Sequence, residues 1–207
     1  MPGQSYDHIV RQMRRTIDIA KEALESEEPK MIGVKGLAPG VIAAAEGFLS
    51  AHDAVVRNTR LIEKEKGESE VSLETLRRVY QQLFHLAKFK GGFGGDVESA
   101  YATDDDFISA AEEMEQVFDE NKDTEWGGQA FERLSTVIDD AAKEFTEFYT
   151  QRRDLQKAFK ERLKAAEKAR DVFVMFRQTV RSVFGRTSKE YKDLADKRYK
   201  NKPEQPE

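Results

Sequence analysis

The longest regular pattern of apolar and polar positions lies between Gln129 and Phe184, a stretch without glycine or proline. Apolar residues recur there in steps of four and three, and this stripe is called the apolar seam below. Thirteen of its fifteen positions are apolar, and the exceptions are the two arginines: Leu134, Ile138, Ala141, Phe145, Phe148, Arg152, Leu155, Phe159, Arg162, Ala166, Ala169, Phe173, Phe176, Val180 and Val183. A period of about 3.5 residues keeps one face of an α-helix toward a partner, whereas a strand alternates every second residue. The stretch is therefore predicted to be one long helix, and a kink or break would fall at 150–154.

Shorter patterns of the same kind predict further helices over 5–24, 39–65 and 72–90, a helix that begins after Thr103, and a last helix over 187–199. Glycine and proline separate them: 33–40 is predicted to be a loop, Gly67 to end one helix, and Ser72 to cap the next. The predicted fold is all-α, an elongated helical bundle of five to six helices with one long C-terminal helix, kinked or straight. Residues 1–200 would form a single domain, followed by a disordered tail at 201–207.

The composition excludes several classes of function. The chain has no cysteine, so disulfides, thiolate nucleophiles and Cys-ligated zinc are excluded. No run of 18 consecutive apolar residues occurs, so we expect no membrane span. The first six residues contain no basic stretch that leads into an apolar one, so no secretory signal is expected either. A cytoplasmic location is the expectation that follows.

The net charge of −5 is unevenly distributed. Residues 96–150 carry 3 Lys/Arg against 17 Asp/Glu, whereas residues 151–200 carry 16 against 7. The first of these segments has a net charge of −14 and the second a net charge of +9. We expect oppositely charged surfaces to meet, within one chain or between copies, and a homodimer is favoured if the long helix is continuous.

The histidines, His8, His52 and His85, show no metal-binding pattern, because none is preceded by glutamate three residues earlier. We therefore predict no metal, no organic cofactor and no enzymatic activity. One alternative stays open. Glu46, Ser50 and Asp53 share a helix face near His52, which suits either acid–base chemistry or an ordinary polar outer stripe.

Two further segments are candidate interaction sites. The segment Lys88–Gly95 is rich in glycine but lacks the Lys-Ser/Thr of a phosphate-binding loop, which favours a linker. Phe93 within it would either dock on the bundle or contact a partner. A cationic stripe on the long helix could follow a phosphate backbone or an anionic membrane surface, or could be a solvated face. Its members are Arg153, Lys157, Lys160, Lys164 and Lys168.

The segment 185–191, with the sequence Gly-Arg-Thr-Ser-Lys-Glu-Tyr, resembles a C-terminal pattern of uncharacterised bacterial helical proteins. The resemblance is confined to these residues and implies no function. The sequence thus favours a non-enzymatic helical scaffold or protein-interaction protein, with a protein partner or self-association. The alternative is nucleic-acid or anionic-surface binding through residues 152–200, and nucleic acid is the less favoured partner.

Overall fold

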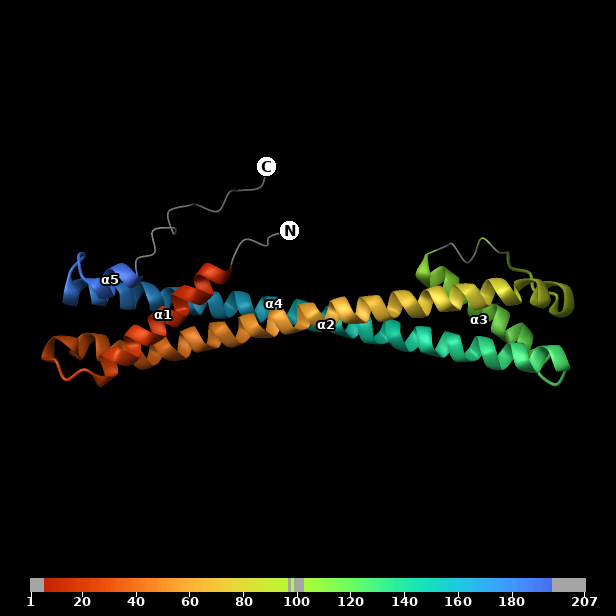
Figure 1. Cartoon of the computed structure of the whole chain (residues 1–207), viewed down its shortest axis with the longest axis horizontal. Coiled ribbons are helices and arrows are strands. Elements are labelled where there is room, and N and C mark those ends of the chain that lie inside the picture. Colours follow the sequence, from red (N-terminus) through yellow and green to blue (C-terminus); the bar gives the residue numbers. More distant parts are fainter. Residues whose placement is uncertain (1–5, 97, 99–102, 195–207) are drawn as a thin grey trace, which may run out of the picture. The chain divides into compact units, whose positions relative to one another are not determined.

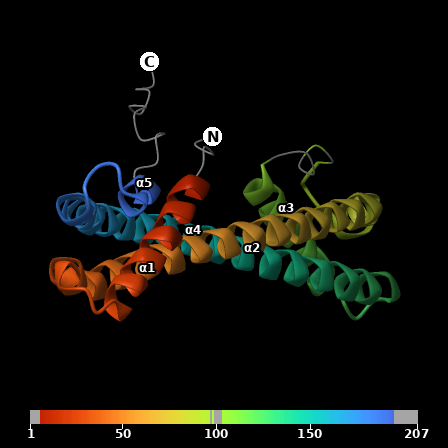
Figure 2. The same cartoon turned by 60° about the vertical axis from the view of Figure 1, so that its left-hand side comes forward.

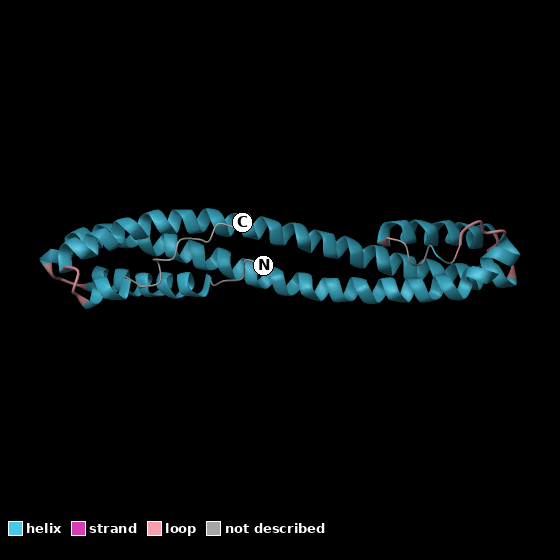
Figure 3. Ribbon diagram, turned by 90° about the horizontal axis from the view of Figure 1, so that it is seen from above, coloured by secondary structure: helices cyan, strands magenta, loops and turns pink. Residues whose placement is uncertain are grey.

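The computed structural model describes residues 6–96, 98 and 103–194, and the regular elements within them are all helical (Figure 1; Figure 3). They are α1 (Tyr6–Glu25), the 3-10 turn η1 (Pro29–Met31), α2 (Ile32–Gly91), α3 (Asp104–Glu120), α4 (Glu125–Phe184) and α5 (Lys189–Leu194). The all-α prediction is confirmed for these residues. The predicted tail at 201–207 and the predicted end of the last helix lie outside them.

Two helices, α2 and α4, are each 60 residues long, whereas the sequence predicted a single long helix. The predicted loop at 33–40 was wrong, since α2 begins at Ile32 and contains Pro39. The reason is the buried face formed by Val34, Ala38 and Val41, which recur at helical spacing. Burying these side chains outweighs the low helix propensity of the glycines between them.

The predicted helix end at Gly67 was also wrong, because α2 continues through it to Gly91. The buried face of α2 runs past this glycine on both sides, with Glu65 and Ser69 nearest and Leu73 and Leu76 beyond. Gly67 itself faces open space and loses no contact by lacking a side chain. Packing on the opposite face therefore carries the helix across a residue with weak helical preference.

The chain divides into two compact units, named unit 1 (residues 1–57 and 156–207) and unit 2 (residues 58–155). The single domain predicted over 1–200 stays a prediction. In unit 1, α1 and α5 lie against the N-terminal part of α2 and the C-terminal part of α4 (Figure 1; Figure 2). Phe48, Phe176 and Val180 are fully buried in its core. The Gln12 side-chain amide donates a hydrogen bond to the Leu194 carbonyl at 3.2 Å, which joins α1 to α5.

In unit 2, α3 packs against the C-terminal part of α2 and the N-terminal part of α4 (Figure 1). Tyr80 lies edge-on to Phe93 and Phe107, with ring centroids 6.3 and 5.4 Å apart. Thr103 caps α3 as predicted, because its hydroxyl accepts a hydrogen bond from the Asp106 backbone N–H. Gly92 has a left-handed φ of 69°, which turns the chain after α2 and directs Phe93 back into the core.

One segment, Pro29–Gly91, is long and apolar enough to cross a membrane, with an 18-residue window of mean hydropathy 1.4. One third of that window is buried within the described structure. A core helix of a soluble protein satisfies the same criterion, so the expectation of no membrane span stays a prediction.

Candidate functional site

Unit 1 contains a pocket of about 360 Å³ between α1, α2 and α4. Its walls are mainly apolar, with charged groups from α4 among them. The lining residues are Tyr6, Ile9, Met13, Phe48, Leu163, Ala166, Glu167, Ala169, Arg170, Phe173, Val174 and Arg177. The pocket can therefore accept an apolar group and place charged groups of the protein beside it.

Helical spacing on α1 and α4 produces this pocket. Tyr6, Ile9 and Met13 follow one another at three- and four-residue intervals, so they project from one face of α1. Across from them, Ala166 and Ala169 on α4 are small, and their short side chains leave room between the two helices. The larger Phe173 of α4 is buried in the core of the unit.

An aromatic and cationic cluster lies beside Tyr6. The guanidinium of Arg162 lies 3.8 Å from the centroid of the Tyr6 ring and 5.0 Å from that of Phe159. Tyr6 also stacks on Phe48, at a centroid separation of 6.2 Å. Cation–π attraction explains why the apolar seam contains an arginine at position 162. The buried Nε of Arg162 has no hydrogen-bond partner among the described residues.

Two arginines and one glutamate supply the charge of the pocket lining. Arg177 is held in place by Tyr191 of α5, to whose hydroxyl it donates a hydrogen bond at 3.4 Å. Arg170 is exposed and forms no ion pair within the described part of the chain. Glu167 is exposed as well. The lining thus carries a net positive charge next to an apolar cavity.

Four residues of the predicted cationic stripe form a row of exposed lysines in unit 1: Lys157, Lys160, Lys164 and Lys168, called the lysine row below. Their spacing of three or four residues places them on one face of α4 over about 16 Å. Within the described residues none of them forms an ion pair. Arg153, the fifth predicted member, is exposed on α4 but belongs to unit 2.

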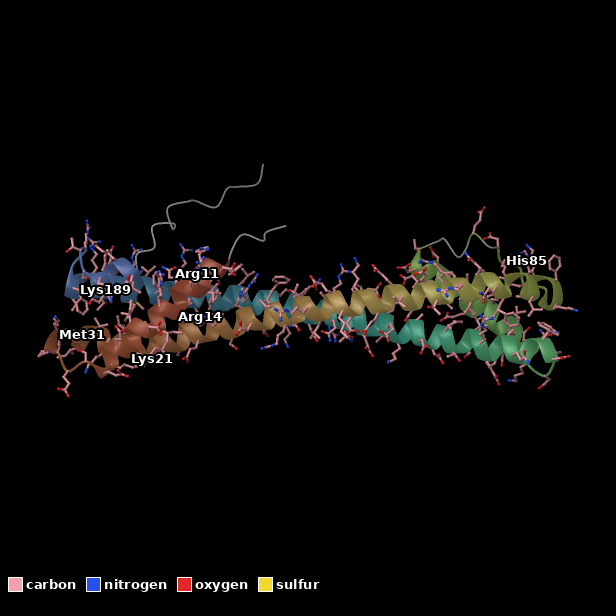
Figure 4. The ribbon with its side chains drawn as sticks, in the orientation of Figure 1. Arg11, Arg14, Lys21, Met31, His85 and Lys189 are labelled. Atoms are coloured by element: carbon pink, nitrogen blue, oxygen red, sulfur yellow. The ribbon has the colours of Figure 1, made fainter. Side chains whose placement is uncertain are left out.

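Helix α1 adds cations to unit 1. Figure 4 shows Arg11, Arg14 and Lys21 along this helix, and all three are exposed. The sequence of unit 1 contains 22 Lys/Arg and 16 Asp/Glu, a net charge of +6. Unit 2 contains 12 and 23, a net charge of −11. The uneven charge along the sequence therefore gives the two units net charges of opposite sign.

The other predicted candidates do not form a site. Glu46, Ser50 and Asp53 are exposed on α2, while His52 packs against the rings of Phe48 and Tyr6. The structure therefore does not bring this histidine together with the carboxylates.

Phe93, the candidate aromatic contact in the glycine-rich segment, is only 5% exposed and packs edge-on against Phe84. Its backbone N–H donates to the Ala87 carbonyl at 3.1 Å. Of the two alternatives left open by the sequence, the structure shows Phe93 docked on the bundle.

Much of the apolar seam is used within the chain. Leu134 and Ile138 lie in the core of unit 2, and Phe173, Phe176 and Val180 in that of unit 1. These side chains are not available as the contact surface of a dimer. Only the central part of the seam is substantially exposed, with Phe159 as its main apolar side chain.

The pocket was not predicted from the sequence. Ala166 and Phe173 are seam positions, but no local pattern distinguishes Arg170 and Arg177. No local signal pairs α1 with the C-terminal part of α4, because the two segments are far apart in the sequence. The lysine row and the seam positions could be predicted because each lies within one helix. Comparison with protein-family models, with curated proteins and with solved structures gave no match to this chain.

Proposed function

We propose that this chain is a non-enzymatic helical scaffold or interaction protein whose unit 1 binds an anionic lipid surface. The supporting observation is that an apolar pocket lined by Arg170 and Arg177 shares a helix with the lysine row. Anionic lipids combine the same two properties, an apolar chain and a negatively charged headgroup.

Two contributions would stabilise such a complex. Each lysine near an anionic bilayer contributes about 1 kcal/mol of attraction, which falls off within a Debye length. Apolar side chains that enter the interface add the free energy of removing their surface from water. Leu163, Val174 and Met175 on α4 are 54%, 45% and 51% exposed and are suited to this role.

Nucleic acid is a less favoured ligand for the same unit. The lysine row could follow a phosphate backbone, but an apolar pocket has no role in contacts to phosphates. The exposed apolar side chains near the row likewise match a bilayer better than a duplex. DNA is therefore the less favoured ligand of unit 1.

Substituting two lysines of the row, Lys164→Gln with Lys168→Gln, is expected to weaken binding to phosphatidylglycerol vesicles by about tenfold or more. The control Lys66→Gln with Lys122→Gln makes the same change in charge on exposed residues of unit 2 and should leave binding unchanged. Vesicle co-sedimentation at low and high salt provides the measurement. Phosphatidylcholine vesicles should bind weakly in both cases.

The same experiment has clear contrary outcomes. Binding to random-sequence DNA but not to anionic vesicles would favour the nucleic-acid alternative. Equal affinity of both double variants for phosphatidylglycerol would exclude the lysine row as the contact surface. Leu163→Gln tests the apolar contribution, and it should reduce binding without changing the salt dependence.

Self-association is a second candidate function, favoured by the opposite charges of the units, +6 and −11. We infer that unit 1 of one copy would face unit 2 of another. Because the apolar seam is largely buried in the cores, electrostatic attraction would have to supply the contact. Single exposed ion pairs contribute about 0.2–1 kcal/mol each, so such a dimer would be weak.

Light scattering tests the second candidate. At high micromolar concentration and low ionic strength, the expected mass approaches that of two chains. Raising the salt concentration to about 1 M shortens the Debye length to about 3 Å and should return the protein to a monomer. A monomer at low ionic strength would contradict this form of self-association.

A further inference from the structure

Three glutamates of unit 2 bring carboxylate oxygens together. Glu65 comes from α2, and Glu144 and Glu147 come from successive turns of α4. One oxygen of each residue lies within 4.8 Å of those of the other two. Three carboxylates at this separation repel one another, so a positive charge beside the cluster is favourable.

The carboxylate of Glu65 is the most buried of the three. This residue is 7% exposed, and its Oε2 is buried without a hydrogen-bond partner in the described structure. The Oε2 of Glu144 is in the same situation on the facing helix. An ionised carboxylate that loses water and gains no partner is strongly destabilised.

Neighbouring lysines compensate this charge only in part. Lys64 lies 3.6 Å from Glu65 Oε1 but donates a hydrogen bond of 2.8 Å to Glu68. That hydrogen bond to Glu68 is the main reason why the pKa of Lys64 is raised above its ordinary value. Lys143 is 3.8 and 3.9 Å from Glu144 and Glu147. Both lysines are largely exposed, and neither reaches the buried Oε2 atoms.

We propose that Glu65, Glu144 and Glu147 bind a divalent cation of the calcium type between α2 and α4. The ligand set consists of carboxylate oxygens alone, which hard cations prefer and which zinc or copper sites rarely use. Ca²⁺ takes oxygens at about 2.3–2.6 Å, so two of its ligands can lie almost 5 Å apart. Mg²⁺ requires about 2.0–2.1 Å and near-ideal octahedral geometry, which fits this spacing less well.

No metal was predicted because the sequence has no cysteine, only three scattered histidines and no Glu-x-x-His spacing. Glu144 and Glu147 have the three-residue spacing of neighbours on one helix face, but such pairs are common on solvated helices. The decisive residue is Glu65, whose partners lie about eighty positions away along the chain. Only the tertiary structure brings it to them.

Calcium titration of the full chain after chelator treatment tests this site. Calorimetry is expected to show one Ca²⁺ per chain, with a dissociation constant of about 10⁻⁴–10⁻³ M for a partly exposed site with few ligands. Glu65→Gln and Glu147→Gln should each weaken binding by about tenfold or more, because each removes one charged ligand. Glu70→Gln, an exposed residue of α2 that pairs with Lys66, is the matched control and should bind normally.

The thermal midpoint of unfolding provides a second readout. Without Ca²⁺, Glu65→Gln should have a higher thermal midpoint than the wild type, because it lacks a buried charge. Adding Ca²⁺ should raise the midpoint of the wild type and of Glu70→Gln only. Absence of Ca²⁺ binding, or equal binding by wild type and Glu65→Gln, would overturn the proposal. If Glu65→Gln does not fold, the half-exposed Glu147 still decides the outcome through Glu147→Gln.

Discussion

Replacing Phe176 with alanine is expected to lower the free energy of unfolding by about 3–5 kcal/mol. Phe176 has no exposed surface and lies in the core of unit 1 between α1, α2 and α4. Truncation would remove its burial free energy and leave a cavity that the neighbouring helices can fill only in part. Urea denaturation followed by far-UV circular dichroism measures the change.

Phe159→Ala is the matched control for this prediction. Phe159 occupies another position of the same seam, in the same helix and the same unit, but its side chain is 38% exposed. Losing it should cost about 1 kcal/mol, since much of its surface already contacts water. Equal losses for the two variants would contradict the burial pattern of α4 in unit 1.

The seam illustrates what could be predicted from the sequence. Its regular apolar period predicted a helix across 129–184, and the structure contains one helix, α4, from Glu125 to Phe184. The exception at Arg162 follows from its contact with the Tyr6 ring, which no periodicity could indicate. The seam also gave no sign that its two ends belong to the cores of different units. The spacing of apolar residues identifies the buried face of a helix but not the element that packs against that face.

Loops predicted from glycine and proline were wrong where buried side chains favour a helix. The glycines and the proline at 33–40 were predicted to form a loop, yet Val34, Ala38 and Val41 are buried on one helix face. A glycine costs a helix about 1 kcal/mol, and each buried valine side chain contributes about 1.5–3 kcal/mol in return. Glycine and proline therefore end a helix only where no buried face continues through the segment.

The candidate sites also differ in whether the sequence predicts them. The lysine row follows from residues three and four apart, so the sequence alone detects it. The pocket requires Tyr6 of α1 to meet Arg170 of α4, and the carboxylate cluster requires Glu65 to meet Glu144. Both depend on contacts between segments distant in the chain. Spacing within one helix carries no information about them.

Replacing Gly67 with proline is expected to destabilise the protein by about 3 kcal/mol or more. Gly67 lies inside α2, with helical residues on both sides. Proline there would remove the backbone hydrogen bond to residue 63 and place its ring against that carbonyl group. Loss of helical signal in far-UV circular dichroism and a lower urea midpoint are the expected observations.

Gly67→Ala is expected to have the opposite sign, a stabilisation of about 0.4–1 kcal/mol. A Cβ at this position meets no atom within 4 Å, and alanine favours the helical backbone that glycine only tolerates. If α2 instead ended at Gly67, as its sequence suggested, a left-handed glycine would be required at the end of the helix. Alanine would then destabilise, whereas proline at residue 67 would destabilise in either case because its φ is fixed at about −65°, so the sign of the Gly67→Ala substitution decides whether α2 continues through residue 67.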